Sequence, residues 1–188
     1  MDLEQTLLPK INEMIRSINE RLNNLDSELN EVIKQLDSRV DQVHKSPQGK
    51  WSPAQILHHL YTSEYGTVTY LKKKVESTEV ASAGIRGFIA SFLLKRALRN
   101  QKTKFKAPEV LGEMPDKPEF EKLRNNYLNL RKELRSVLDR FDKRMAKKAY
   151  FKHPVVGRMN IYQTLSFLEE HFDRHKKQIY ERLSHGKE

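Results

Sequence analysis

The chain has 188 residues, of which 37% are hydrophobic and 32% are charged, with only seven glycines and seven prolines. This length suits one domain with a substantial core, and the composition favours long solvated helices over a sheet-rich or disordered chain. We therefore expect a single all-α domain over residues 1–188. The absence of cysteine excludes a disulfide, a thiolate metal ligand or a catalytic thiol supplied by the chain itself.

The net charge of +10 and the pI near 9.7 raise nucleic acid and anionic membranes as candidate partners. Basic residues cluster in segments 93–106 and 142–148, but no aromatic interleaving or nucleic-acid-binding motif accompanies them. The N-terminal segment carries acids where a signal peptide needs basic residues, and the longest apolar run, GFIASFLL, is too short to span a bilayer. We expect a cytoplasmic protein whose principal partner is neither nucleic acid nor a membrane surface.

Four segments carry apolar residues at helical spacing, and each predicts an amphipathic helix with one inward face. The first stripe, which alone also fits a coiled coil, comprises Ile11, Ile15, Ile18, Leu22, Leu25, Leu29, Val32 and Leu36. The second comprises Ile56, His59, Leu60, Ser63, Thr67 and Leu71. The third comprises Phe120, Leu123, Tyr127, Leu130, Leu134, Val137 and Phe141. The fourth comprises Ile161, Leu165, Leu168, Phe172 and Ile179.

Three of these helices have a recognisable start. A capping box pairs a short polar side chain with a Glu or Gln three residues later, and each satisfies a backbone N–H of the other. Candidate boxes are Ser52 with Gln55, Asp116 with Glu119, and Asn160 with Gln163.

Connection lengths predict the order of the helices. Short connections at 44–50 and 150–158 make the first pair and the last pair antiparallel. Roughly forty residues separate the second helix from the third, enough to return along the bundle and leave these two parallel. We therefore predict an up-down-down-up four-helix bundle with a long crossover between helices 2 and 3.

The crossover itself contains an apolar stripe at helical spacing, formed by Ile85, Phe88, Ile89, Phe92 and Leu93. This pattern predicts an extra short helix that covers the bundle, with a lid or a membrane-surface helix as the alternative.

Three histidines fall on inward faces. His59 belongs to the stripe of the second helix, while His171 and His175 are four residues apart and so stack on one face of the fourth. Antiparallel packing of these helices would bring the three imidazoles to one level, where they suit Zn²⁺ or Ni²⁺ and leave coordination positions open. The alternative is that each is a hydrogen-bonded core histidine without a metal.

Two segments resemble the DinB-like (DinB/YfiT) superfamily. WSPAQILHHLYTSE is similar to its second-helix motif at Trp51, His59, Leu60 and Glu64. HPVVGRMNIYQTLSFLEEHFDRHKKQI is similar to its last loop and helix at His153, Pro154, Gly157, His171, His175, Gln178 and Ile179. The resemblance covers nearly the whole chain, and the spaced histidines are its most specific element.

The resemblance implies a divalent ion, zinc or nickel, bound by His59, His171 and His175, and a homodimer. It also implies a metal-dependent enzyme for a small-molecule substrate, since characterised relatives include transferases and isomerases that use thiols such as mycothiol or bacillithiol. A metal lowers the pKa of a bound thiol, and this cysteine-free chain would take a low-molecular-weight thiol from outside.

Several alternatives stay open. Hydrolysis is an alternative reaction. The alternative functions are a non-catalytic, metal-stabilised binding or stress-associated module, and a basic binder of membrane surfaces or nucleic acid. No catalytic or substrate-binding residue is identified: Glu64 suits either a role beside the metal or a surface or capping carboxylate, and Arg174 suits either an anionic substrate or solvent. Trp51 is expected to pack at the helix start, and His153 to shape its loop.

Overall fold

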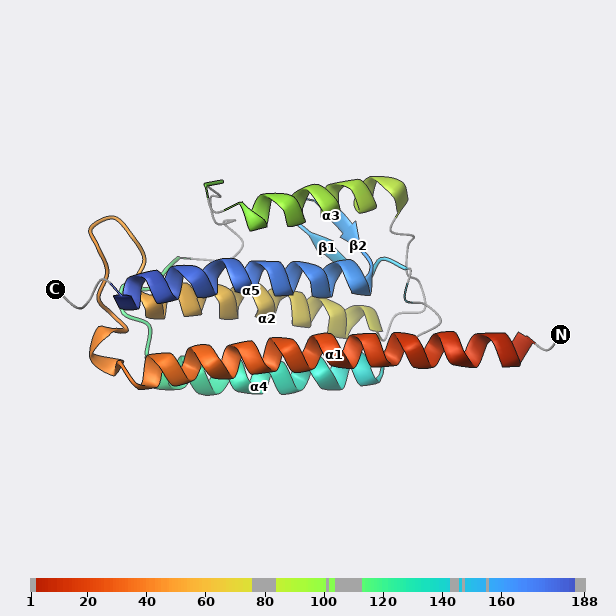
Figure 1. The fold of residues 1–188 in the computed structure, drawn as a ribbon, viewed down its shortest axis with the longest axis horizontal. Helices are drawn as coiled ribbons and strands as arrows, with labels where there is room; N and C mark the ends of the chain where they lie inside the picture. The colour runs from red at the N-terminus through yellow and green to blue at the C-terminus, as the bar shows by residue number, and fades with distance from the viewer. Residues whose placement is uncertain are drawn as a thin grey trace.

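A computed structural model describes residues 3–75, 84–100, 102–103, 113–142, 146, 148–154 and 156–184. In this part of the chain, five α-helices and one hairpin follow one another (Figure 1). The elements are α1 (Leu3–Asp37), the 3-10 helix η1 (Val40–Gln42), α2 (Pro53–Val75), α3 (Gly84–Arg99), α4 (Phe120–Asp139), β1 (Phe151–His153), β2 (Gly157–Met159) and α5 (Ile161–Ser184).

Helices α1, α2, α4 and α5 lie side by side, with α1 and α2 each contacting both α4 and α5. Figure 1 shows α1 and α5 running from right to left, and α2 and α4 in the opposite direction. Side-chain pairs agree with the parallel course of α1 and α5, because Arg21 pairs with Glu169. Further along both helices, the Tyr180 hydroxyl donates to Glu31. Within the described residues, no helix is both long and apolar enough to cross a bilayer.

The prediction of a mostly helical chain is confirmed, but an all-α class omits the small sheet before α5. Strands β1 and β2 pair antiparallel, with Phe151 opposite Met159 and His153 opposite Gly157. Gly157 has a φ of +80°, a conformation that glycine adopts without steric cost. Strands of three residues are too short for a period-two pattern to appear in the sequence.

Two of the three predicted capping boxes form. The Ser52 backbone N–H donates to Gln55 Oε1 at 2.9 Å, and the Gln55 N–H donates back to Ser52 Oγ at 3.3 Å. Asn160 and Gln163 make the same reciprocal pair at 2.8 and 2.9 Å.

The predicted box at Asp116 and Glu119 is wrong. Helix α4 begins at Phe120, and Glu119 is the N-cap residue with an extended backbone and no side-chain cap bond. Pro118 accounts for the later start, because a proline disfavours helical geometry in the residue before it.

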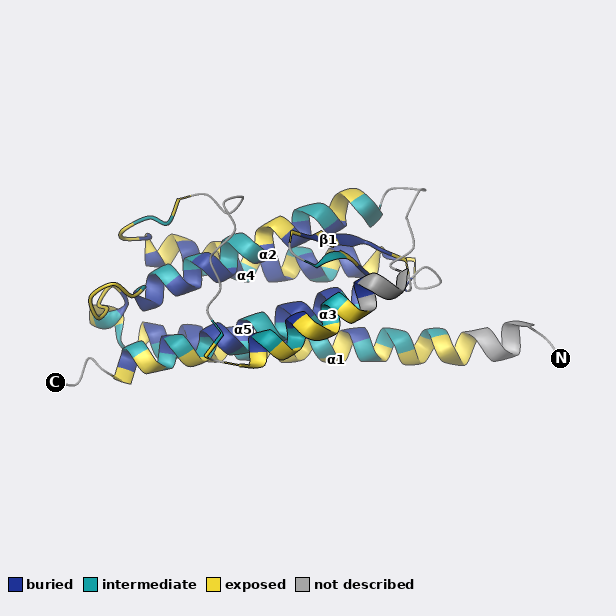
Figure 2. Ribbon diagram, turned by 90° about the horizontal axis from the view of Figure 1, so that it is seen from above, coloured by how far each residue is buried: buried dark blue, intermediate teal, exposed yellow. Residues whose placement is uncertain are grey.

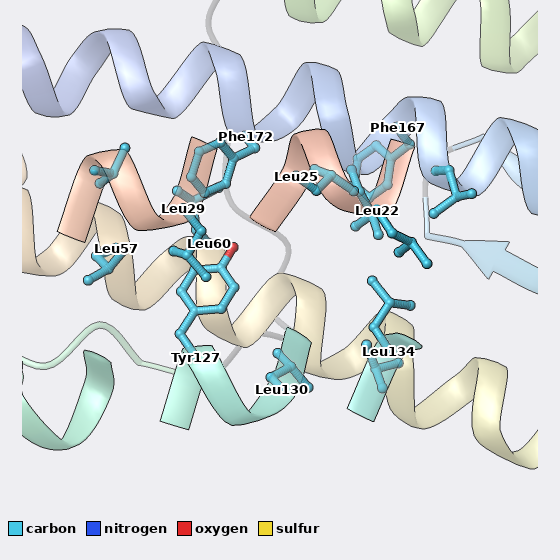
Figure 3. Packing of buried hydrophobic residues seen from close by; sticks show 14 of the residues in the cluster. Leu22, Leu25, Leu29, Leu57, Leu60, Tyr127, Leu130, Leu134, Phe167 and Phe172 are labelled. Atoms are coloured by element: carbon cyan, nitrogen blue, oxygen red, sulfur yellow. The ribbon is translucent and has the colours of Figure 1, made fainter. Parts of the chain in front are cut away.

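The four predicted apolar stripes meet in one interior (Figure 3). Leu22, Leu25 and Leu29 of α1 enter it, as do Tyr127, Leu130 and Leu134 of α4. From the other two helices come Leu57, Leu60, Phe167 and Phe172. Hydrophobic periodicity therefore identified the core-facing side of all four helices correctly.

Helix α3 confirms the predicted extra helix in the crossover, but it presents a different face from the predicted one. It packs on α5 and β2 with Gly87, Leu94 and Leu98 inward. Ile89, Phe92 and Leu93 are instead 53%, 60% and 56% exposed. The side chains of Ile85 and Phe88 lie outside the described part. Figure 2 shows exposed segments along α3 on the side away from α5.

Contacts near both ends of α3 explain this orientation. A Cβ added at Gly87 would lie 2.4 Å from the Arg158 carbonyl oxygen of β2, so only glycine allows this approach. Toward the other end, Arg99 pairs with Glu170 through two hydrogen bonds of 2.7 and 2.8 Å. Lys95 reaches the same carboxylate at 3.4 Å. These contacts, together with buried Leu94 and Leu98, fix the inner face and leave Ile89, Phe92 and Leu93 outside.

A buried ion pair lies between α2 and α4. Arg131 Nε is 2.7 Å from Glu64 Oε1, and both side chains are 4% exposed. The Tyr127 hydroxyl donates to Glu64 Oε2 at 2.9 Å. Burial raises the pKa of Glu64, while Arg131 and Tyr127 favour its ionised form. The interpretation of Glu64 as a surface or capping carboxylate is therefore wrong.

Replacing Arg131 with methionine should lower the free energy of unfolding by about 3–5 kcal/mol, because it leaves the Glu64 carboxylate buried without its counter-charge. Lys72→Met is the matched control, since Lys72 joins the same two helices through Glu133 but both side chains are solvent-accessible. We expect that control to cost at most about 1 kcal/mol. Urea unfolding followed by circular dichroism measures both, and equal losses would contradict a dominant role for the buried pair.

Gly87→Ala should destabilise the packing of α3 on β2, because the new Cβ would clash with the β2 backbone. This loss should exceed the gain of about 1 kcal/mol that alanine brings to a helix. Gly66→Ala in α2 is the control, since its Cβ would meet nothing within 4 Å and should stabilise the protein. Hydrogen exchange of α3 amides and urea unfolding distinguish the two. A stabilised Gly87→Ala protein with unchanged exchange in α3 would refute the close approach.

Candidate metal centre

The three predicted histidines come together between α2 and α5. One nitrogen from each of His59, His171 and His175 lies within 4.8 Å of the others. His59 Nε2 and His171 Nε2 are 3.3 Å apart, and the His175 ring centroid is 4.8 Å from that of His59. The antiparallel course of α2 and α5 produces this meeting, since the start of α2 lies beside the C-terminal half of α5.

Burial keeps these imidazoles neutral near pH 7. Desolvation lowers the pKa of His59 to about 4, with the neighbouring His58 as a second cause. Desolvation and then His59 lower the pKa of His175 to about 3, and the pKa of His171 is well below its ordinary value for similar reasons. Neutral imidazole is the form that binds a metal ion.

Gln178 selects which nitrogen of His175 is available. Its Oε1 lies 2.8 Å from His175 Nδ1, so that nitrogen carries the proton and donates it to the amide oxygen. The lone pair of His175 is then on Nε2. A hydrogen bond of this kind commonly orients a metal-binding histidine.

The donor set therefore fits a divalent ion. Two Nε2 atoms at 3.3 Å repel each other if both carry lone pairs, and a proton or a cation between them removes that repulsion. Three neutral nitrogens from rigid helices match the ligand number of many zinc sites that keep a position open for water or substrate.

Aromatic rings enclose the cluster on two sides. The half-buried Trp51 ring lies 5.2 Å from the His59 ring, and Phe167 stacks on His171 at 5.3 Å with an interplanar angle of 17°. The His153 ring packs edge-on against Phe167, with the two ring centroids 4.6 Å apart. These contacts limit ring rotation of His59 and His171. The predicted packing role of Trp51 thus extends to the ring of His59.

His153 also has the loop role predicted for it. The Val156 backbone N–H donates to His153 Nδ1 at 3.4 Å, which ties the turn between β1 and β2 to the imidazole. The side chain is 9% exposed, and burial lowers its pKa to about 4.

Arg174 is buried and contacts backbone carbonyls, so the interpretation of this residue as a solvated side chain is wrong. Its Nη1 donates to the carbonyls of Leu98 and Asn100 at 3.1 and 2.8 Å, and Nη2 donates to that of Thr103 at 2.5 Å. Carbonyls at a helix C-terminus lack helical donors, which makes them acceptors for a guanidinium. Arg174 therefore holds the end of α3 against α5.

The other histidines are separate from the described cluster. His44 is exposed and His58 is half-buried, whereas His185 lies outside the described residues. Neither His44 nor His58 is part of the three-histidine cluster.

Gln178 and Phe167 were not assigned a role from the sequence, although both follow helical spacing. Gln178 is three residues after His175, and Phe167 is four residues before His171, so each shares a helix face with a ligand candidate. Their positions three and four residues from the histidines are the sequence signal that identifies them. The contact between Trp51 and His59 spans eight residues and depends on how the chain enters α2.

The depressed histidine pKa values predict acid sensitivity of the metal-free protein. Because the unfolded state has pKa values near 6.5, it binds more protons than the folded state between pH 6.5 and about 4. The histidines therefore contribute full stability above pH 6.5 and lose it as pH falls, by up to about 1.4 kcal/mol per pH unit for each proton. Urea unfolding of chelator-treated protein at pH 7 and pH 5 measures this slope.

His59→Gln should flatten that slope, whereas His44→Gln should leave it unchanged because His44 is exposed. Identical slopes in the wild type and both variants would contradict neutral burial of His59.

Comparison with known proteins adds one finding. A family model described as the DinB superfamily matches residues 11–179, which is most of the chain and includes all three clustered histidines. No curated protein and no solved structure matches the chain.

Proposed function

The chain belongs to the DinB superfamily, and from that premise we propose that it is a metal-dependent enzyme acting on a small molecule. His59, His171 and His175 bind one divalent ion, zinc or nickel, in this proposal. The observation that carries it is the meeting of three neutral imidazole nitrogens within 4.8 Å, drawn from two helices far apart in sequence.

The ion would supply Lewis-acid chemistry, lowering the pKa of a bound water or thiol so that its deprotonated form is present near pH 7. The chain's own residues hold and orient the ligands. Gln178 keeps the proton of His175 on Nδ1, and Trp51 and Phe167 pack on the rings of His59 and His171. These contacts fix the nitrogens before the ion arrives, which limits the entropy lost on binding.

The reaction we favour is transfer of a low-molecular-weight thiol to an electrophilic substrate, with hydrolysis as the alternative. The chain contains no cysteine, so the sulfur nucleophile must come from a second substrate. Family resemblance supports this choice, because relatives with thiol-dependent activity share the spaced histidines. In such a transfer the thiol sulfur would form a bond to the electrophilic carbon while the bond from that carbon to its leaving group breaks. The leaving group would depart with the electron pair of that bond, and the thiol proton would go to solvent.

We further infer that α1, α2, α4 and α5 constitute an up-down-down-up four-helix bundle within a single domain over residues 1–188. The contacts and directions of these helices support that arrangement. A homodimer and a cytoplasmic location remain predictions, the former from the family resemblance and the latter from the sequence.

Metal binding tests the premise of the proposal. Purified protein reconstituted with zinc or nickel should retain about one ion per chain, and His59→Ala, His171→Ala or His175→Ala should each weaken binding at least tenfold, roughly the effect of losing a ligand interaction. His44→Ala and His58→Ala are the controls and should keep full stoichiometry. Elemental analysis and competition with a chromogenic chelator provide the measurement, and an equal loss in the controls would refute the site.

Thiol transfer tests the reaction. Metal-loaded protein should accelerate conjugation of small thiols to a panel of electrophiles, and the chelator-treated protein and the His175→Ala variant should return the rate to that in solution. A rate independent of metal across the panel would exclude the transferase. Metal-dependent cleavage of ester or amide substrates without thiol would then favour hydrolysis.

A further inference from the structure

Helix α3 has three large apolar side chains on its outside. Ile89, Phe92 and Leu93 are each more than half exposed and lie on one face of the helix, at spacings of one, three and four residues. Most soluble proteins expose large apolar residues singly, and a contiguous group of them marks an interaction surface. We call the group Ile89, Phe92 and Leu93 the outer face of α3.

The outer face is not a consequence of loose packing. Gly87 lies against β2 so closely that no Cβ fits, and Arg174 binds carbonyls at and beyond the C-terminal end of α3. Lys95 hydrogen-bonds Ser166 of α5 at 3.1 Å and approaches Glu170. These contacts hold the inner side of α3 on α5 and β2, so turning the apolar residues inward would break all of them.

The charged residues of α3 itself are all basic. The sequence of α3, GIRGFIASFLLKRALR, contains four basic residues and no acidic one. Arg96 is exposed and lies between Phe92 and Leu93 when the helix is viewed along its axis, and Lys102 is exposed just beyond the helix. The Arg99 side chain is 63% exposed despite its pair with Glu170.

This combination favours an anionic lipid surface over a second copy of the chain. Two copies meeting symmetrically through α3 would bring Arg96 and its copy together, and like charges oppose that contact. A helix with Phe, Leu and Ile on one side and Arg or Lys around them is typical of helices that lie in the membrane interface. The basic side chains can extend to lipid phosphates while the apolar ones enter the acyl region.

We propose that the outer face of α3 docks on anionic membrane surfaces, with Ile89, Phe92 and Leu93 inserted at the headgroup level and Arg96 contacting lipid phosphate. Helix α5, which carries His171 and His175, lies directly behind α3. Docking would hold the histidine cluster near the membrane without closing α3 over it. The proposal goes beyond the proposed enzymatic function and does not depend on it.

Vesicle sedimentation tests the proposal with the full chain. Wild-type protein should bind phosphatidylcholine vesicles containing phosphatidylserine, bind pure phosphatidylcholine vesicles far less, and be released by high salt. Arg96→Glu should lower affinity for the anionic vesicles about 25-fold, since each basic residue near such a surface strengthens binding about fivefold and charge reversal counts twice. Phe92→Asp should lower it at least about fivefold, because it adds one repelled charge and removes an inserted apolar side chain.

Two substitutions on α1 are the matched controls. Leu8 is 58% exposed, close to the 60% of Phe92, and Lys10 is exposed like Arg96. Leu8→Asp and Lys10→Glu should leave vesicle binding within about twofold, the size expected for a remote charge under screening. Circular dichroism and urea unfolding confirm that every variant is folded.

Three results would overturn the proposal. The first is absence of wild-type binding to the anionic vesicles. The second is an equal loss of binding in the α1 and α3 variants, which would indicate only a diffuse effect of the net charge of +10. The third is a dimer in sedimentation velocity that Phe92→Asp dissociates while vesicle binding is unchanged, which would assign the outer face to a second copy.

Discussion

The antiparallel contact between α2 and α5 is the feature on which the site and much of the surrounding structure depend. It brings His59 to the level of His171 and His175, and it closes the interior around apolar residues such as Leu60 and Phe172. Burying these imidazoles has a cost, because their nitrogens lose water as a hydrogen-bond partner, while desolvation keeps the rings neutral at pH 7. A cation shared by the three nitrogens would offset that cost, which neither a proton on one ring nor a water molecule can do for all three.

Helix α5 connects this cluster to the rest of the fold. One face carries the histidines and the apolar residues, whereas Ser166, Glu170 and Arg174 hold α3. Arg174 directly precedes His175 and binds the carbonyls of Leu98, Asn100 and Thr103. The position of α3 is thus set by polar contacts and a glycine, while the four long helices are set by apolar burial. The apolar residues of the four long helices are therefore in the core, whereas Ile89, Phe92 and Leu93 of α3 are exposed.

Local sequence patterns were sufficient to predict the features that belong to a single helix, such as its core-facing side. The four stripes, two helix caps and the placement of His59, His171 and His175 all follow from spacing alone, because burial of apolar area dominates at those positions. The orientation of α3 could not be predicted in this way. Its largest apolar residues suggested an inward stripe. The contacts that orient the helix, Gly87 with Arg158 and Arg99 with Glu170, join residues about 70 positions apart in the sequence. The hairpin was also missed, since three-residue strands carry no period.

Buried charge was the other limit of the sequence. Glu64 and Arg131 are 67 positions apart, and nothing local to either residue indicates that they form an ion pair in the interior. Arg174 likewise gave no sign that its partners would be backbone carbonyls of the crossover. The three histidines could be identified from the sequence because a histidine is unusual on an apolar stripe. Gln178 and Phe167, which contact His175 and His171, resemble ordinary helix residues.

X-ray absorption spectroscopy of the zinc- or nickel-loaded protein tests the central claim most directly, because it reports the atoms bound to the metal. The account predicts three imidazole nitrogens, at about 2.0–2.1 Å for zinc, with the multiple-scattering features of histidine rings and one or more oxygen ligands in the remaining positions. A spectrum with only oxygen neighbours, or with fewer than two imidazoles, would show that the ion binds elsewhere and that the three histidines are a metal-free part of the core.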